Sequence, residues 1–326
     1  EESDQKYAMI LAIWGALGLP LSLEKAVRGK IVTWTSATFT PEPGCVTVEV
    51  KRAIVEDTMT MVKDALAKNL IPIKELRTLT GKLTHIASLV MTLRPFLSEL
   101  YAAQTSNKGS PPPGCIWMVQ VETVLKWVTA CLGGLPGKLE RKYYLSAYMQ
   151  SSLQISLELD ASPWGLGGVL LEDGKPISWF ATPLSTEELI LLDIKLGDAA
   201  AQQTVEALAA LVALRGWHQR WLTRRSVIRV RSDSVSALVL ALKLKTRGRA
   251  PGIIAREMAL DIAAANYTPD VAEHVPGIHN TIPDALSRKY QPGQRFIVPD
   301  VLKDVPELQL KLRGRDYFRS LGAPPT

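Results

Sequence analysis

Four carboxylates stand at positions where an α/β sheet commonly builds a site. Asp160 ends a segment that alternates apolar and polar residues, and Asp233 ends another such segment. Glu206 lies early in a long helical pattern, and Asp284 lies in the first turn of the last helical pattern. Strand ends and helix starts at one edge of a sheet can bring such side chains together. Because converging carboxylates repel one another, this arrangement favours divalent cations as partners.

The type of ligand narrows the choice of cation. Oxygen-only ligation favours Mg²⁺ or Mn²⁺, and the widely spaced Cys45, Cys115 and Cys131 favour neither a zinc site nor a disulfide framework. Each acid also has a plainer reading, as a turn or cap residue for an aspartate and as a solvated helix position for Glu206. It is the joint order of the acids along the chain that favours a site.

The elements that must position these acids follow from the periodicity of the second half. Residues 153–160 have the pattern of a strand, and "GLGGVLLE" and "PISWFA", joined by Asp-Gly, predict two more strands of an antiparallel meander. A helix from Asp198 as N-cap to Arg215 follows, then the strand "SVIRVRS" and further helix and strand patterns up to Arg288. The order βββαβαβα predicts an α/β fold with a mixed sheet covered by helices.

The first half is mainly helical. "KIVTWTSATFT" alternates like one strand, and long helical patterns run from residue 50 to about residue 103. "SNKGSPPPG", residues 106–114, predicts a flexible linker, because successive prolines sustain neither a helix nor an inner strand. Residues 291–326, with scattered proline and glycine, predict a tail or the start of a linker.

Composition sets outer bounds on the function. The chain has 326 residues, 47% of them hydrophobic, which suffices for a packed core and favours two domains over one. Its net charge of +6 fits a polyanionic partner without requiring one. No apolar run approaches a membrane span, and the opening "EESDQK" is unlike a signal peptide, so we expect a soluble protein that is not secreted. The missing initiator methionine indicates a piece of a longer polypeptide.

Four ordered segments over residues 152–290 resemble the ribonuclease H domain of retrotransposon polyproteins: "LELDASPWGLGGVL", "AQQTVEALAALVALRGW", "VIRVRSDSVSAL" and "EHVPGIHNTIPDALSR". The resemblance implies a ribonuclease H-like five-stranded sheet. It also implies hydrolysis of the RNA strand of an RNA/DNA hybrid with two Mg²⁺ or Mn²⁺ ions. The family's catalytic and metal-binding acids carry over, position by position, to Asp160, Glu206, Asp233 and Asp284.

The last of these segments has features of its own. We expect Gly277 and Asn280 to support a tight turn and the start of the last helix, so that Asp284 faces the site. His279 stands one place later than the histidine that aids turnover in cellular relatives, and it is more in keeping with a solvated loop residue. His274, inside the preceding strand, is expected to be packed or hydrogen-bonded.

Basic and glycine-rich stretches are candidates for contacts with the nucleic acid. Gly165, Gly167 and Gly168 leave the second strand bare, which fits either close approach of a nucleic-acid backbone or a bulge. The basic run "LKLKTRGRA" fits phosphate contacts and equally a solvated loop. Its candidate residues are Lys243, Lys245, Arg247 and Arg249.

The resemblance extends upstream. "LGLPLSLEKAVRGKIVTWTSATF" resembles the end of a reverse transcriptase palm, and "LRTLTGKLTHIASLVMTLRPFLSELYAA" resembles the thumb and connection that follow it. No Asp-Asp pair, the polymerase signature, occurs in the chain, so we expect no polymerase activity from it alone. The domains expected are the palm end with thumb and connection at 1–105, a linker and connection helix at 106–151, the ribonuclease H-like domain at 152–290 and a tail at 291–326.

The function expected from these observations is that of a hybrid-specific endoribonuclease. Its partners would be the RNA/DNA hybrid and the remainder of a reverse transcriptase polyprotein of a gypsy-like or DIRS-like retrotransposon, in the cytoplasm or nucleus and without a membrane. The main alternative is a catalytically inactive nucleic-acid-binding or structural remnant. An actin-like ATPase, which shares the sheet topology, is disfavoured because paired glycine-rich phosphate loops are missing.

Overall fold

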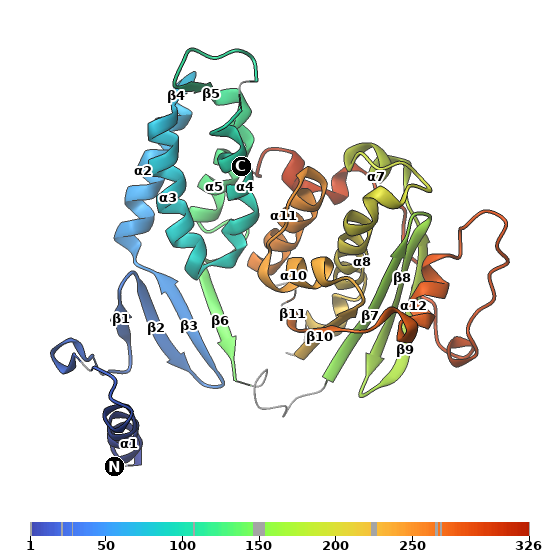
Figure 1. Ribbon diagram of the computed structural model, residues 1–326, viewed down its shortest axis with the longest axis horizontal. Coiled ribbons are helices and arrows are strands. Elements are labelled where there is room, and N and C mark those ends of the chain that lie inside the picture. The colour runs from blue at the N-terminus through green and yellow to red at the C-terminus, as the bar shows by residue number, and fades with distance from the viewer. Residues whose placement is uncertain are drawn as a thin grey trace.

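The computed structural model forms two regions that lie side by side, the first up to residue 145 and the second from residue 154 (Figure 1). No helix in the described part of the chain is long and apolar enough to cross a membrane. The residues that the structure describes are 2–20, 22–27, 29–106, 108–145, 154–222, 227–264, 267 and 269–325.

The first region combines helices with an antiparallel sheet in the order β1-β2-β3-β6. Its strands are β1 (Val32–Trp34), β2 (Ala37–Glu42), β3 (Cys45–Val50), β4 (Leu70–Pro72), β5 (Cys115–Trp117) and β6 (Glu140–Tyr144). Its helices are α1 (Glu2–Ala16), α2 (Arg52–Leu66), α3 (Ile73–Leu89), α4 (Arg94–Ala103) and α5 (Glu122–Leu132), with 3₁₀ turns at Leu23–Lys25, Met91–Leu93 and Met118–Gln120.

Two details of the first region differ from expectation. The single strand expected over "KIVTWTSATFT" is a hairpin of β1 and β2, because Thr35 reverses the chain with a φ of 52°. Residues 108–114 of the proline-rich segment form a loop inside this region, since β5 directly after them pairs with β4 and the Ile73 amide donates to the Gly114 carbonyl at 2.8 Å. The proline-rich segment is therefore not a boundary between the two regions.

The second region contains a five-stranded mixed sheet in the order β11-β10-β7-β8-β9. β7, β8 and β9 form the expected antiparallel meander, with Asp173 and Gly174 in the turn between β8 and β9 at φ of 47° and 79°. β10 runs parallel to both β7 and β11. The strands are β7 (Gln154–Ser162), β8 (Gly165–Glu172), β9 (Lys175–Pro183), β10 (Val227–Ser232) and β11 (Pro269–His274). This order confirms the expected α/β fold class with its ribonuclease H-like sheet.

Helices cover both faces of this sheet (Figure 1). On one face Phe180 of β9 packs against Trp217 at the end of α8, with 5.2 Å between ring centroids. On the other face Val169 and Trp179 pack with Leu286 of α12. The helices are α7 (Thr186–Leu191), α8 (Gln202–Gly216), α9 (Gln219–Leu222), α10 (Val235–Lys243), α11 (Arg249–Ala263) and α12 (Thr281–Ser287), with 3₁₀ turns at Ala199–Ala201 and Gly277–His279.

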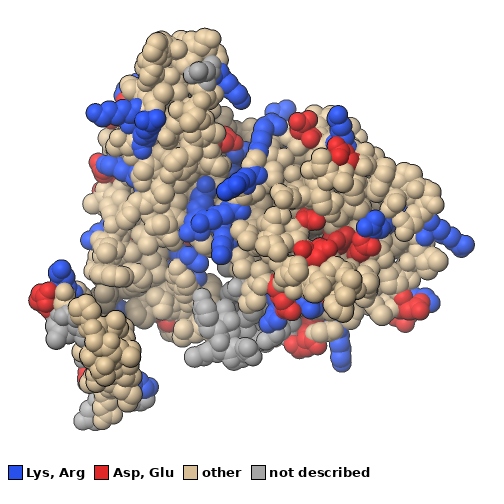
Figure 2. All heavy atoms as spheres, viewed as in Figure 1, with Lys and Arg blue, Asp and Glu red and all other residues tan. Residues whose placement is uncertain are grey.

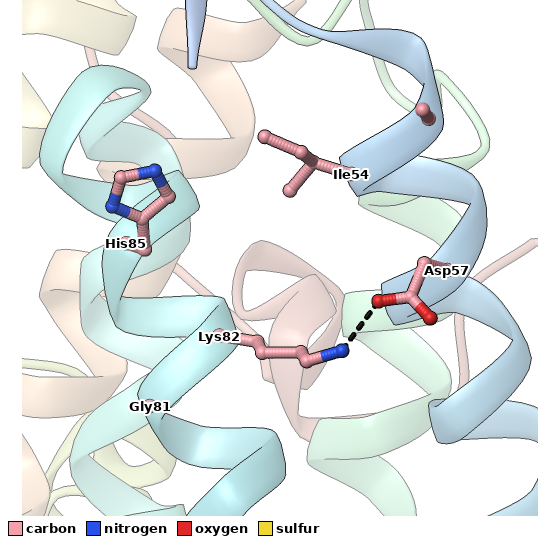
Figure 3. Close-up of a pocket in the computed structure, with 6 residues that line it drawn as sticks. Ile54, Asp57, Gly81, Lys82 and His85 are labelled. Carbon is pink, nitrogen blue, oxygen red and sulfur yellow. Dashed lines mark hydrogen bonds and ion pairs between the residues drawn. The ribbon is translucent and has the colours of Figure 1, made fainter. Parts of the chain in front are cut away.

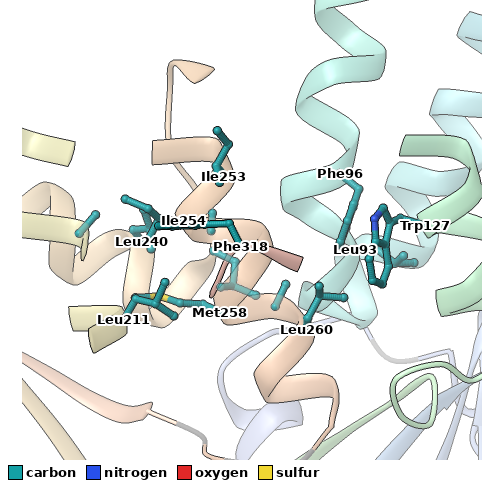
Figure 4. Close-up of a cluster of buried hydrophobic side chains, with 14 of the residues drawn as sticks. Leu93, Phe96, Trp127, Leu211, Leu240, Ile253, Ile254, Met258, Leu260 and Phe318 are labelled. Carbon is teal, nitrogen blue, oxygen red and sulfur yellow. The ribbon is translucent and has the colours of Figure 1, made fainter. Parts of the chain in front are cut away.

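The two regions share one hydrophobic core. Phe96 of α4 and Trp127 of α5 belong to the same buried cluster as Leu260 of α11 and Phe318 near the end of the chain (Figure 4). Such a shared core excludes water from the contact between the regions, so burial of apolar surface stabilises their relative position.

Residues 299–322, here called the C-terminal strap, are packed, whereas a tail was expected. The Leu308 amide donates to the Trp179 carbonyl at 2.7 Å beside the edge strand β9, and the Trp127 indole of α5 donates to the Gly322 carbonyl at 2.8 Å. The strap therefore runs from the second region to the first (Figure 1). Its 3₁₀ turns are Asp300–Leu302, Arg315–Tyr317 and Arg319–Leu321.

A buried ion pair anchors the middle of the strap. The Arg313 guanidinium bonds to both carboxylate oxygens of Glu188 on α7 and to the Thr182 hydroxyl, and both charged side chains are almost fully buried. The Ser185 hydroxyl donates to the Arg313 carbonyl at 2.7 Å. Because these residues are far apart in sequence and show no shared period, sequence patterns did not indicate this contact.

Candidate active site

The sheet topology brings two of the four acids to one edge. Asp160 lies near the end of β7, and Asp233 directly follows β10, the parallel neighbour of β7. Glu206 reaches this edge from α8 and Asp284 from α12. Their charges are close enough that Asp233, Asp284 and Glu206 each raise the pKa of Asp160. Figure 2 shows acidic side chains gathered on one face of the second region.

Asp160 is the most buried of the four acids, with 6% of its surface exposed. Burial, followed by the charges of the other acids, raises its pKa to about 7, although a hydrogen bond from Ser287 lowers it. In that bond the Ser287 hydroxyl of α12 donates to Oδ2 of Asp160 at 2.7 Å. Near neutral pH the carboxyl group is therefore divided between its protonated and ionised forms.

Glu206 and Asp233 differ in how they are held. Burial raises the pKa of Glu206, while hydrogen bonds from Ser234 and Gln202 lower it. The Gln202 amide lies 3.0 Å from Oε1 of Glu206 and 2.6 Å from the Ala161 carbonyl, so it ties α8 to the end of β7. Oδ1 of Asp233, in contrast, is buried and has no hydrogen-bond partner among the described residues. An orphaned buried carboxylate oxygen calls for a cation or a donor.

Asp284 lies at the outer side of this group. Its side chain is 43% exposed, and Oδ1 accepts a hydrogen bond from Nε of Arg288 at 2.8 Å. This hydrogen bond raises the pKa of Arg288. Arg288 is exposed, so its ion pair neutralises Asp284 at the solvent side of the group.

The turn before α12 is built as the spacing predicts, but one side chain acts differently. Gly277 lies beside Asp233, since a Cβ on it would be 3.3 Å from Oδ2 of that acid. Asn280 precedes α12, yet its buried side chain does not cap the helix and instead donates to the Leu159 carbonyl at 3.1 Å. Asn280 therefore fastens the start of α12 to the strand that carries Asp160.

The two histidines and the glycines are placed as follows. His279 is exposed, as expected, whereas His274 is exposed at the end of β11 and not packed. Gly165, Gly167 and Gly168 are buried, and β8 pairs with β7 in register along them, so they form no bulge there.

The glycines of β8 serve close packing inside the protein. A Cβ on Gly167 would lie 2.5 Å from the Pro283 carbonyl and 2.6 Å from the Ser287 amide of α12. A Cβ on Gly168 would lie 2.4 Å from the ring of Phe180. The idea that they leave room for a nucleic-acid backbone is thus wrong, because α12 and Phe180 fill that space.

The donor atoms at this edge fit Mg²⁺ or Mn²⁺ in type. All four side chains offer oxygen, Asp233 keeps an orphaned buried oxygen, and the mutual repulsion would be relieved by a cation. In the described part of the chain, however, no three His, Cys, Asp or Glu side chains lie close enough together to hold a metal ion. Ser287, Gln202 and Arg288 each donate a hydrogen bond to one of these carboxylates.

The four basic candidates gather elsewhere, between α10 and α11. Lys243 ends α10, Arg249 begins α11, and Lys245 and Arg247 lie in the loop between them. All four are exposed. The loop faces the first region, where Arg94 of α4 donates to the Lys243 carbonyl at 3.2 Å. Sequence reasoning missed Arg94, for which the only signal was a basic residue before a proline.

Comparisons with known proteins give similarity in structure only. No protein-family model and no curated protein matches the chain. Nine chains of solved structures match, among them the ribonuclease H1 named LC11, isolated from compost, with 17% identity and a TM-score of 0.31 over 43% of this chain and 94% of that one.

Two further matches are structures of a foamy viral protease-reverse transcriptase. The one in complex with an RNA/DNA hybrid is 15% identical, with a TM-score of 0.33 over 96% of this chain and 36% of that one. The one in complex with double-stranded DNA is 15% identical, with a TM-score of 0.28 over 78% and 47%. This chain thus spans about a third to a half of these viral proteins. At such identities and TM-scores the likeness carries no argument about chemistry.

Proposed function

We propose that this chain is an endoribonuclease that hydrolyses the RNA strand of RNA/DNA hybrids. The observation that carries the proposal is the convergence of Asp160, Glu206, Asp233 and Asp284, from four separate elements, on the edge where β7 and β10 end. Buried acids whose pKa values are shifted by one another are typical of functional sites. The ordered motifs that resemble ribonuclease H supply the reaction type.

The four acids would hold two Mg²⁺ or Mn²⁺ ions as oxygen ligands. When bound, such ions activate a water and stabilise the leaving oxygen of a phosphodiester. The side chains around the acids hold them in position. Asn280 and the glycines of β8 seat α12 on the sheet, so that Asp284 and Ser287 stay beside Asp160.

Proton release from Asp160 links this site to pH. Because its pKa is about 7, the carboxyl must lose a proton before it can bind a cation at neutral pH. We therefore expect cation affinity and hydrolysis to rise with pH until Asp160 is fully ionised.

Cleavage of an end-labelled RNA strand tests the proposal. The chain and its Asp233→Asn variant would be incubated with an RNA/DNA hybrid and Mg²⁺ or Mn²⁺, with single-stranded RNA and duplex DNA as other substrates. Asp300→Asn, which removes an exposed acid of the strap, is the matched control. We expect cleavage of the hybrid alone, lost in Asp233→Asn and kept in the control. A folded chain that leaves the hybrid intact contradicts the proposal.

A catalytically inactive nucleic-acid-binding remnant is the second candidate. One observation favours it: three of the four carboxylates already have partners in the protein, and no cluster close enough for a metal ion forms among the described residues. Calorimetric titration with Mn²⁺ separates the two candidates. Two binding events that disappear in Asp233→Asn support the nuclease, and no heat of binding at millimolar Mn²⁺ supports the remnant.

We further propose that the chain belongs to the polyprotein of a gypsy-like or DIRS-like retrotransposon and acts inside the cell, in the cytoplasm or nucleus. The support is the upstream resemblance to palm, thumb and connection together with the shared core of the two regions. Its partner would then be the remaining reverse transcriptase, because the polymerase aspartate pair does not occur in this chain.

A further inference from the structure

An ion pair joins the end of α12 to the C-terminal strap. Lys289 follows α12, and its amide donates to the Leu286 carbonyl at 3.2 Å, which continues the last helical turn. Its ammonium nitrogen Nζ lies 2.9 Å from Oε1 of Glu307 in the strap. The two residues are 18 positions apart, so the pair closes a loop that leaves α12 and returns to the edge strand β9 (Figure 1).

Three aromatic rings lie close to the Lys289 ammonium. Nζ lies 5.4 Å from the ring centroid of Phe296, 5.6 Å from that of Trp179 and 5.7 Å from that of Tyr290. The negative faces of aromatic rings attract a cation at such distances. The Lys289 and Glu307 side chains are only 24% and 26% exposed, so solvent screens their ion pair less than a pair at the open surface. The rings and the carboxylate together therefore hold the ammonium, and we call this arrangement the lysine clamp.

The strap presents Glu307 from a backbone that is bound to the sheet. Trp179 of β9 is 4% exposed, and its backbone binds the strap on both sides of Glu307. The Trp179 amide donates to the Pro306 carbonyl at 3.2 Å, and the Leu308 amide donates to the Trp179 carbonyl at 2.7 Å. The indole of the same tryptophan donates to the Val305 carbonyl at 2.9 Å. The carboxylate therefore has a defined position to which the ammonium binds.

The lysine clamp acts on a short helix that carries two residues of the candidate site. α12 has seven residues and contains both Asp284 and Ser287. Asn280 fastens its start to β7, the Ser162 hydroxyl donates to the Ser287 carbonyl at 2.8 Å, and Lys289 holds its end from the side of the strap. A helix this short is marginal on its own, so its position depends on such contacts. Any shift of α12 moves both site residues together relative to the sheet.

A lysine–carboxylate pair in the first region provides a contrast. Lys82 of α3 reaches across to Asp57 of α2 beside a hollow of about 470 Å³ (Figure 3). The two side chains are 40% and 61% exposed. Ion pairs with this much exposure to solvent contribute little to stability. Because this pair joins two helices of the first region, its removal is a matched control for removal of the lysine clamp.

We propose that Lys289 is a positioning residue that holds α12 against the sheet. Through its contacts with the strap and the three rings, it keeps Asp284 and Ser287 beside Asp160. In the described part of the chain Lys289 forms neither a hydrogen bond nor an ion pair with any of the four acids, so it acts through the helix. Resting on the proposed function, the position of α12 sets how tightly the acids bind a divalent cation and how fast the RNA strand is cut.

Substitutions in the full chain test this role. Lys289→Met removes the charge at a similar side-chain length, Lys289→Arg keeps the charge, and Glu307→Gln removes the charge of its partner. Lys82→Met is the control. Amide hydrogen exchange in EDTA, read at α12 and at β7, measures how firmly the helix is held. Calorimetric titration with Mn²⁺ and rates of hybrid cleavage measure the consequence for the site.

We expect exchange of the α12 amides in Lys289→Met to be roughly 10-fold faster, with β7 unchanged, because the helix opens more readily without the lysine clamp. Mn²⁺ affinity and kcat should both fall about 10-fold, as for residues that orient metal ligands, while KM for the hybrid stays the same. Glu307→Gln should act in the same direction. Lys289→Arg should behave like the unaltered chain, and Lys82→Met should change none of these quantities.

The exchange measurement separates failure of the lysine clamp from failure of the proposed function. Unchanged exchange at α12 in Lys289→Met and Glu307→Gln, or an equal increase in Lys82→Met, overturns the lysine clamp, and hybrid cleavage by the unaltered chain then leaves the proposed function standing. Faster exchange at α12 alone, restored by Lys289→Arg, supports the lysine clamp even if the chain neither binds Mn²⁺ nor cleaves, in which case only the proposed function fails.

Two further outcomes are also decisive. Faster exchange throughout the second region, or a loss that Lys289→Arg does not restore, shows a general packing defect and overturns the positioning role. If Lys289→Met does not fold, Glu307→Gln decides by the same criteria, because it leaves the lysine and its apolar stem in place.

Discussion

The second region contains two groups of carboxylates, one paired with arginines and one left without them. Glu257 and Asp261 of α11 are 0% and 2% exposed, and Arg215 of α8 bonds to them at 2.7 and 2.6 Å. Arg319 of the strap adds contacts to both. Asp160 and Asp233, at the edge of the sheet, have no arginine in contact with them among the described residues.

The pKa values reflect this difference. Burial lowers the pKa of Arg215, but the charge and hydrogen bond of Asp261, together with Tyr317 and Tyr267, raise it, and the net shift is upward, so Arg215 stays charged. At the sheet edge the pKa of Asp160 is raised to about 7, because burial and neighbouring acids are not offset by a cation. Arginines thus neutralise the carboxylates of α11, whereas the carboxylates at the sheet edge are left to repel one another, a pattern typical of functional sites.

The largest expected effect comes from breaking the neutralised group. Arg215→Met leaves Glu257 and Asp261 buried with only the partners that the strap and Tyr267 supply, so we expect the free energy of unfolding to fall by about 3 to 5 kcal/mol. Urea unfolding at neutral pH measures it. The control Arg220→Met, on an exposed arginine of α9, should change stability by about 0.5 kcal/mol or less. Similar losses of unfolding free energy in both variants would show that the ion pairs of Arg215 are not needed for stability.

Removing a charge from the unneutralised group should instead raise the free energy of unfolding. The pKa of Asp160 in the folded protein lies above the ordinary value of 3.8 for an aspartate. Its ionisation therefore costs nothing at lower pH and destabilises the fold increasingly as pH rises from 3.8 to about 7. Asp160→Asn removes this cost, which reaches about 4 kcal/mol above pH 7 in the metal-free protein by the usual linkage.

Unfolding free energies of the chain and of Asp160→Asn, measured in EDTA from pH 4 to pH 8, check this. The variant should gain stability relative to the chain as pH rises, while hybrid cleavage is lost. A difference that stays constant with pH would show that Asp160 is not perturbed.

A third change tests what keeps α12 beside these acids. In Gly167→Ala the new methyl group would meet the Pro283 carbonyl at 2.5 Å and the Ser287 amide at 2.6 Å, so α12 must move. We expect about 1 to 3 kcal/mol of lost stability, as for overpacked cores, and weaker hydrolysis than stability alone explains. Gly81→Ala on α3, where a Cβ meets open space, is the control. Thermal unfolding and cleavage rates report the two effects separately.

The smallest expected effect sharpens the role of one hydrogen bond. Ser287→Ala removes the hydroxyl that lowers the pKa of Asp160, so the pH midpoint of hydrolysis should rise, by about one unit or less. A pH–rate profile measures the midpoint. Ser178→Ala, which removes a buried hydroxyl bonded to Trp217, should leave the midpoint in place. A downward shift in Ser287→Ala would contradict the assigned donor.

How far the sequence predicts this protein depends on whether a feature is local. The alternation that ends at Asp160 and the Asp-Gly turn at 173–174 have short periods, and the structure contains both elements. The convergence of the acids was expected from their places at strand ends and helix starts and from the resemblance to ribonuclease H. The hydrogen-bond partners of the acids were not predicted, because no sequence spacing indicates that Ser287 and Gln202 bond to them.

Two other features were hidden for the same reason. From the sequence, Gly167 showed only that one position of a strand carries no side chain. Whether a helix or a ligand fills the space beside that position depends on where α12 packs. Arg94 and the α10–α11 loop are about 150 residues apart, with a separation of 149 between Arg94 and Lys243, so their meeting follows from how the regions pack.

The C-terminal strap has a consequence for the order in which the protein is made. Arg313 completes the buried partner of Glu188, and Gly322 accepts the Trp127 indole, although Trp127 is translated 195 residues earlier. Until this stretch leaves the ribosome, Glu188 lacks its counter-charge and the two regions lack their last fastening. The final packing of both regions therefore waits for the strap, and the chain passes through a period in which its second region is synthesised but not yet fastened.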